Sequence, residues 1–209
     1  METLKLIRII FLLTALIWYN QEIFSQDFTT VKDAFQNSYI QEATGDFSAA
    51  ALSLKNVYDE KSYEINLRLG WLTYLSGNFI ESQAYYNKAI TLRPFAIEPR
   101  FGIIYPVSAL GNWTFAIGQY EKIIEIAPNN TYALHRLGLI YYGREDYETA
   151  LKYFEKVVNL YPFDYDALTM LGWTYFKLKN YREAKVLFQK ALLNTPNGSS
   201  ATEGLDLLK

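Results

Sequence analysis

The chain has 209 residues and a formal net charge of -2; half of its residues are hydrophobic and 17% are aromatic. This length and apolarity allow a sizeable core and exclude a disordered chain, and the balanced charge leaves no basic footprint for nucleic acid. Cysteine is absent, which excludes a disulfide framework, a thiol nucleophile and a thiolate metal site.

The first 25 residues differ from the rest of the chain. Lys5 and Arg8 precede an almost purely apolar run, Ile9 to Tyr19, which has the length of a signal-peptide core and is shorter than the ~20 residues of a membrane span. Ser25 provides a small residue at a plausible cleavage point. We interpret residues 1–25 as a cleaved signal peptide of a periplasmic or secreted protein. An uncleaved, membrane-anchored N-terminal helix and a cytosolic protein with an apolar first helix are the alternatives.

The remainder of the chain is internally repetitive. Prolines recur every 34 residues, and several other positions follow the same period. The recurring residues are Pro94, Pro128, Pro162 and Pro196; Leu69, Ile103, Leu137 and Leu171; Gly70, Gly138 and Gly172; Phe79, Trp113, Tyr147 and Tyr181; Ala116, Ala150 and Ala184; and Tyr86, Tyr120, Phe154 and Phe188.

This pattern resembles the tetratricopeptide repeat, a helix–turn–helix unit of about 34 residues. Segments 137–162 and 171–196 match its signature most closely, and a degenerate copy lies at 31–62, where Asn37-Ser38 replace the Leu-Gly pair. The resemblance implies an all-α fold, a right-handed superhelical α-solenoid of about five repeats in residues 31–198. The expected repeats are 31–62, 63–96, 97–130, 131–164 and 165–198.

Each repeat is expected to contain two amphipathic helices. A glycine in the first helix costs ~1 kcal/mol of helix propensity, and we expect it to be tolerated because it lets the second helix approach closely. Proline then ends the second helix, and neighbouring repeats stack to bury their apolar faces. Residues 199–209 predict a C-terminal capping helix. Pro106, inside the first helix of the third repeat, predicts a kink.

A second stripe runs along each first helix. We number the positions of each repeat so that the Leu-Gly pair is seven and eight. Positions five, nine and twelve then form a stripe that lies roughly 130° around the helix from the stripe that contains this pair. The resemblance implies that this stripe lines the concave surface where peptides usually bind. An exposed aromatic stripe marks a partner surface; the alternative for any one ring is packing on a neighbouring helix. The predicted groove residues are Phe35, Tyr39, Trp71, Tyr74, Phe101, Tyr105, His135, Tyr142, Trp173 and Phe176.

Other ligand classes find less support. The family's clamp of Lys, Asn and Arg side chains on a peptide carboxylate has no counterpart at the groove positions, which argues against chaperone-tail binding. His135 is the single histidine and cannot build a metal site alone. Because no phosphate loop, nucleophile elbow or HExxH sequence occurs, we expect no cofactor, no metal, no catalytic residue and no enzymatic activity.

The sequence therefore predicts a non-catalytic scaffold or adaptor of the cell envelope, which binds a peptide or partner protein in an aromatic concave groove. Two alternatives stay open. One is a structural subunit of an envelope complex that assembles through its end or convex faces. The other is a glycan-binding module, because Tyr and Trp rings also suit sugar rings.

Overall fold

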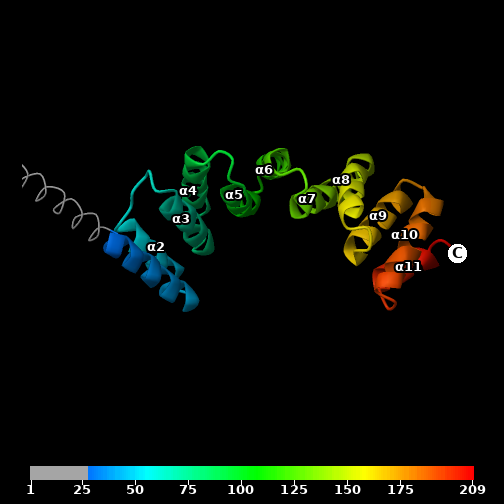
Figure 1. The fold of residues 1–209 in the computed structure, drawn as a ribbon, viewed down its shortest axis with the longest axis horizontal. Helices are drawn as coiled ribbons and strands as arrows, with labels where there is room; N and C mark the ends of the chain where they lie inside the picture. The colour runs from blue at the N-terminus through cyan, green and yellow to red at the C-terminus, as the bar shows by residue number, and fades with distance from the viewer. Residues whose placement is uncertain (1–27) are drawn as a thin grey trace, which may run out of the picture. The chain divides into compact units, whose positions relative to one another are not determined.

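A computed structural model describes residues 28–209, which form helices joined by short turns, without a strand in that range (Figure 1). The described chain begins in a helix over residues 28–43. The helices that follow are α2 (Phe47–Lys55), α3 (Tyr63–Leu75), α4 (Phe79–Leu92), α5 (Glu98–Ala109), α6 (Trp113–Ile126), α7 (Thr131–Gly143), α8 (Tyr147–Leu160), α9 (Tyr165–Lys177), α10 (Tyr181–Asn194) and α11 (Ser199–Asp206). The predicted all-α fold is confirmed. The predicted signal peptide, residues 1–25, lies outside the described residues.

The chain divides into two compact units, and the boundary lies between Leu110 and Gly111. In unit 1, α3 packs on α2, α4 and α5, and α5 also packs on α4. In unit 2, α7 packs on α6 and α8, α9 packs on α8 and α10, and α11 packs on both α9 and α10. The boundary separates α5 from α6, so the expected third repeat contributes one helix to each unit.

The recurring glycines contact aromatic rings of the following helix. A Cβ atom added at Gly70 would lie 2.9 Å from Tyr86, one at Gly138 would lie 2.6 Å from Phe154, and one at Gly172 would lie 2.7 Å from Phe188. These distances are too short for any side chain. The expectation that glycine permits a close approach is therefore confirmed, and the group that approaches is the buried ring of the second helix.

Two of these rings also contact a second glycine. Gly102 of α5 contacts Tyr86, and Gly204 of α11 contacts Phe188. The Tyr86 and Phe188 rings therefore each contact a glycine of their own repeat and a glycine of the element that follows. Helix α5 continues through Pro106 to Ala109, so the proline does not end it.

A left-handed residue ends the turn between the paired helices. Gly77 and Gly111 take φ values of 80° and 75° at this position, and Glu145 and Lys179 take 63° and 64° at the equivalent position in unit 2. Glycine adopts this conformation without strain, whereas a residue with a Cβ atom incurs about 1 kcal/mol or more. The same turn is thus formed in both units.

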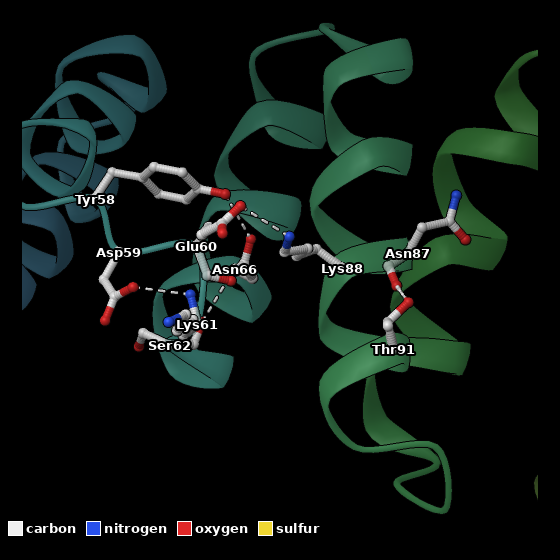
Figure 2. A network of polar contacts seen from close by, with 9 residues as sticks. All are labelled: Tyr58, Asp59, Glu60, Lys61, Ser62, Asn66, Asn87, Lys88 and Thr91. Atoms are coloured by element: carbon white, nitrogen blue, oxygen red, sulfur yellow. Dashed lines mark hydrogen bonds and ion pairs between the residues drawn. The ribbon is translucent and has the colours of Figure 1, made fainter.

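A buried amide organises the turn before α3, where the sequence lacks the recurring proline. The Asn66 side chain donates to the carbonyls of Glu60 (3.1 Å) and Ser62 (2.7 Å) and accepts from the Tyr58 hydroxyl (3.1 Å), as Figure 2 shows. Lys88 of α4 forms an ion pair of 3.0 Å with Glu60. Since Asn66 is fully buried, these bonds fix the path of the turn against α3.

Candidate partner-binding groove

A groove of about 580 Å³ opens on unit 1 between the helix over residues 28–43, α3 and α5, and we call it the unit 1 groove. Seven of its twelve lining residues are aromatic. The lining consists of Phe35, Tyr39, Tyr63, Glu64, Leu67, Arg68, Trp71, Tyr86, Glu98, Phe101, Gly102 and Tyr105.

The helical repeat explains how these rings share one surface. Phe35 and Tyr39, like Phe101 and Tyr105, are four residues apart, so each pair lies on one face of its helix. Five predicted groove residues line this groove: Phe35, Tyr39, Trp71, Phe101 and Tyr105. Sequence reasoning and the structure therefore identify the same faces of these three helices.

Three rings at the end of the groove contact one another. Trp71 meets Tyr105 edge to face with centroids 6.0 Å apart, and Tyr74 lies 5.7 Å from Trp71 and 5.4 Å from Tyr105. Tyr74 also packs on Phe79 at 5.8 Å. Such contacts hold the rings in fixed orientations. The predicted residue Tyr74 thus supports the rings of the groove and is not among its lining residues.

A partly buried ion pair lies at the groove, where Arg68 lines it and Glu42 is the partner of Arg68. Nη2 of Arg68 lies 2.5 Å from Oε2 of Glu42, the Trp71 indole donates to Oε1 of the same carboxylate at 2.7 Å, and the guanidinium stacks 4.0 Å above the Tyr39 ring. Burial alone would raise the pKa of Glu42, but the bonds from Arg68 and Trp71 outweigh it and hold that pKa below its usual value. The positive charge of Arg68 is therefore matched within the chain.

Two acidic side chains, Glu64 of α3 and Glu98 of α5, also line the groove. The Tyr63 hydroxyl donates to Oε2 of Glu98 at 3.3 Å. Burial, followed by the negative charges of Glu98 and Glu64, raises the pKa of Tyr63 to about 12, and Arg93 opposes this shift more weakly. Both carboxylates are exposed. The groove thus combines aromatic side chains with exposed carboxylates.

The predicted groove residues did not include five polar or aromatic members of this groove: Tyr63, Glu64, Arg68, Tyr86 and Glu98. Arg68 was missed because it lies at position six, outside the predicted stripe, and yet its long side chain lines the groove. A signal existed for the carboxylates. Glu64 and Glu98 occupy position two, which is three residues before position five and therefore lies on the same helical face.

The remaining predicted residues belong to unit 2 and contact their own neighbours. His135 packs edge to face on Phe154 at 5.6 Å and lines a smaller pocket of about 340 Å³ with Tyr132 and Tyr161. Burial lowers the pKa of His135. Tyr142 meets Tyr147 at 5.2 Å.

Trp173 and Phe176 pack within the C-terminal core of unit 2. The Trp173 ring lies 5.0 Å from Phe188 and 5.5 Å from Phe176, and its indole donates to Ser200 of α11 at 2.8 Å. These contacts match the alternative in which a groove-position ring packs on neighbouring helices. Trp173 thus links α9 to α11, which packs on α9 and α10.

Residues 28–209 provide neither a metal site nor a membrane span. No group of three or more His, Asp or Glu side chains in this range could hold a metal ion. None of the helices in the same range combines the length and the apolarity that crossing a bilayer requires.

This chain is similar to a known repeat family and to several solved structures. Models of the tetratricopeptide repeat match residues 63–95 and 132–192, and no curated protein sequence matches. The MamA protein is 22% identical with a TM-score of 0.68, over 79% of this chain and 91% of its own. A tetratricopeptide repeat protein from Parabacteroides merdae is 21% identical with a TM-score of 0.72, over 86% and 72%.

A third solved structure is that of YrrB, described as a tetratricopeptide protein with an unusual peptide-binding site. It is 16% identical with a TM-score of 0.66, over 84% of this chain and 92% of its own. At these identities the comparisons concern the fold, and they confirm the predicted α-solenoid.

Proposed function

Because this chain is a tetratricopeptide repeat protein, we propose that it is a non-catalytic scaffold that binds a partner protein or peptide in the unit 1 groove. Tetratricopeptide proteins are generally interaction scaffolds, and the YrrB structure is described by its peptide-binding site. The observation that carries the proposal is the groove itself, with seven aromatic residues around about 580 Å³.

Two rings of the groove keep a large area that a partner can cover. Tyr39 is 55% exposed and Tyr105 is 47% exposed. Partly exposed Tyr and Trp side chains that are held rigidly by their neighbours lose little conformational entropy on binding and are frequent binding hot spots. Contacts to Trp71 and Tyr74 restrain Tyr105 in this way.

Truncating Tyr105 tests the proposal. Partners are captured by crosslinking from the native envelope fraction and identified, and their affinity for the purified protein is then measured. Tyr105→Ala is expected to weaken binding at least tenfold, which corresponds to ~1.4 kcal/mol. Tyr181→Ala is the matched control, because Tyr181 is 49% exposed and lies outside the groove. Equal affinity of the Tyr105 variant and the native protein would contradict the proposal.

We also propose export to the periplasm or cell envelope, on the residues of the 1–25 segment alone. The mass of the native protein from an envelope fraction measures this directly. Loss of about 25 residues supports a cleaved signal peptide. An intact N-terminus in the membrane fraction would favour the anchored alternative.

A second surface supports the alternative of a structural subunit. A groove of about 660 Å³ lies on unit 2 between α8, α9 and α10, where Tyr175 donates to Glu155 at 2.8 Å and Val186 is 57% exposed. If assembly uses this face, Val186→Glu is expected to dissociate the envelope complex while partner binding by the unit 1 groove stays intact. Competition by soluble sugars at the unit 1 groove would instead favour the glycan alternative.

A further inference from the structure

We propose that the unit 1 groove selects a partner segment in which a Lys or Arg side chain stands next to an apolar residue. The inference rests on the proposed function and names the chemistry of the segment that binds. It follows from three features of the groove: unpaired carboxylates, an internally matched arginine, and aromatic faces that accept a cation.

The carboxylates of the groove have acceptor capacity to spare. Glu64 and Glu98 hold the same position in consecutive repeats and both line the groove. Each accepts a hydrogen bond from a hydroxyl group, Glu64 from Ser62 and Glu98 from Tyr63, both at 3.3 Å. Neither forms an ion pair within residues 28–209. Each ionised carboxylate can accept further hydrogen bonds, including those of an ammonium or guanidinium group.

Arg68, the basic residue of the groove lining, does not neutralise the carboxylates of Glu64 and Glu98. Arg68 is paired with Glu42 at 2.5 Å, and its side chain is only 10% exposed. The carboxylate of Glu42 also accepts the Trp71 indole. Because this pair is neutral as a unit, the uncompensated charge that an incoming segment meets along the lining is that of Glu64 and Glu98.

The groove already contains one example of the contact that we infer. The Arg68 guanidinium lies 4.0 Å above the Tyr39 ring, which is within the range of a cation–π interaction. A Lys or Arg side chain of a partner can lay its methylene stem along Phe101 and Tyr105 and direct its charged end toward Glu98, because long basic side chains pack their stems on apolar surface. An adjacent apolar side chain then fills the space beside Trp71.

Synthetic peptides test the charge preference. The probes are end-blocked heptapeptides of sequence Ala-Ser-Leu-Xaa-Phe-Ser-Ala, in which Xaa is Lys, norleucine or Glu. Norleucine keeps the lysine stem and removes the charge. Isotope-edited NMR titration of the full chain gives the dissociation constants at low salt. We expect the Lys peptide to bind about tenfold more tightly than the norleucine peptide, and we expect added salt to reduce this advantage.

Variants assign the preference to the two carboxylates. Glu64→Gln combined with Glu98→Gln is expected to remove the advantage of the Lys peptide over the norleucine peptide. Asp33→Asn is the matched control, because Asp33 is an exposed carboxylate of unit 1 outside the groove lining. The control is expected to keep the full tenfold difference.

The outcomes separate this inference from the proposed function. Equal binding of the Lys and norleucine peptides, or tighter binding of the Glu peptide, overturns the charge preference and leaves a groove that binds peptides. An advantage that persists in the double Gln variant overturns the assignment to Glu64 and Glu98. Absence of binding by all three peptides, together with a native-like affinity of Tyr105→Ala for captured partners, overturns both proposals.

Discussion

Replacing Gly172 by alanine probes the packing at the C-terminal end of unit 2. A Cβ atom at this position would lie 2.7 Å from Cε1 of Phe188, so the ring would have to retreat by about 0.7 Å to reach an ordinary contact of 3.4 Å. Retreat is obstructed, because Phe188 is fully buried and Gly204 of α11 contacts its opposite side.

The expected magnitude follows from two opposing contributions. Overpacking a rigid core costs ~1–3 kcal/mol, while alanine gains ~1 kcal/mol over glycine in a helix interior. The net effect of Gly172→Ala is therefore a loss of about 1 kcal/mol in the free energy of unfolding. Gly118→Ala is the matched control: Gly118 also lies inside a helix of unit 2, and nothing lies within 4 Å of the added Cβ atom. This control is expected to gain about 1 kcal/mol.

Urea unfolding followed by circular dichroism measures the difference. With a slope of ~2 kcal/mol/M, the two variants separate by about 1 M in midpoint. Phe188→Leu is expected to cost less stability in the Gly172→Ala background than in the native protein, since the smaller side chain relieves the contact with the added Cβ atom. The reasoning is refuted if Gly172→Ala stabilises the protein as much as Gly118→Ala does.

Three further predictions concern other sites. Asn66→Ala leaves the carbonyls of Glu60 and Ser62 and the Tyr58 hydroxyl without this partner, and a loss of ~2–3 kcal/mol is expected in urea unfolding. Trp173→Phe keeps a ring but removes the hydrogen bond to Ser200. Amide hydrogen exchange in α11 is expected to become faster by a factor that corresponds to ~1 kcal/mol. Unchanged exchange would contradict this prediction. Burial raises the pKa of Tyr63 and of Tyr175 to about 12 from 10.0. Because the unfolded chain then releases these protons first, the free energy of unfolding should fall as the pH rises from about 10 to about 12, and Tyr63→Phe with Tyr175→Phe should flatten that decline.

The site could be predicted only in part. Helical periodicity placed Phe35 with Tyr39 and Phe101 with Tyr105 on one face of each helix, the resemblance implied that these faces line one surface, and the structure brings the four residues together in the unit 1 groove. The same periodicity placed Trp173 at an equivalent position, where α11 packs beside it. The local sequence determines on which face of its helix a ring lies. Which residues cover that face depends on the helix that packs against it in the folded chain.

Polar partners escaped prediction for a related reason. Arg68 and Glu42 are 26 residues apart in the sequence and meet only because α3 packs against the preceding repeat. A pattern with a period of 34 identifies positions that recur, and this ion pair occurs once. The buried Asn66 escaped for the same reason, since asparagine stands at this position in one repeat and the other repeats have Ala34, Arg100, Leu134 and Leu168 there.

The amino-acid sequence by itself determined that this protein is a helical repeat, because the 34-residue period of Pro, Gly and aromatic residues specifies where each helix begins, ends and buries its face. Only the tertiary structure decided which rings remain open to a partner, that Arg68 is neutralised by Glu42, and that the compact units divide between α5 and α6. These outcomes depend on contacts between residues that are distant in the chain. Their free energies belong to pairs of side chains, and a pattern along one chain does not contain them.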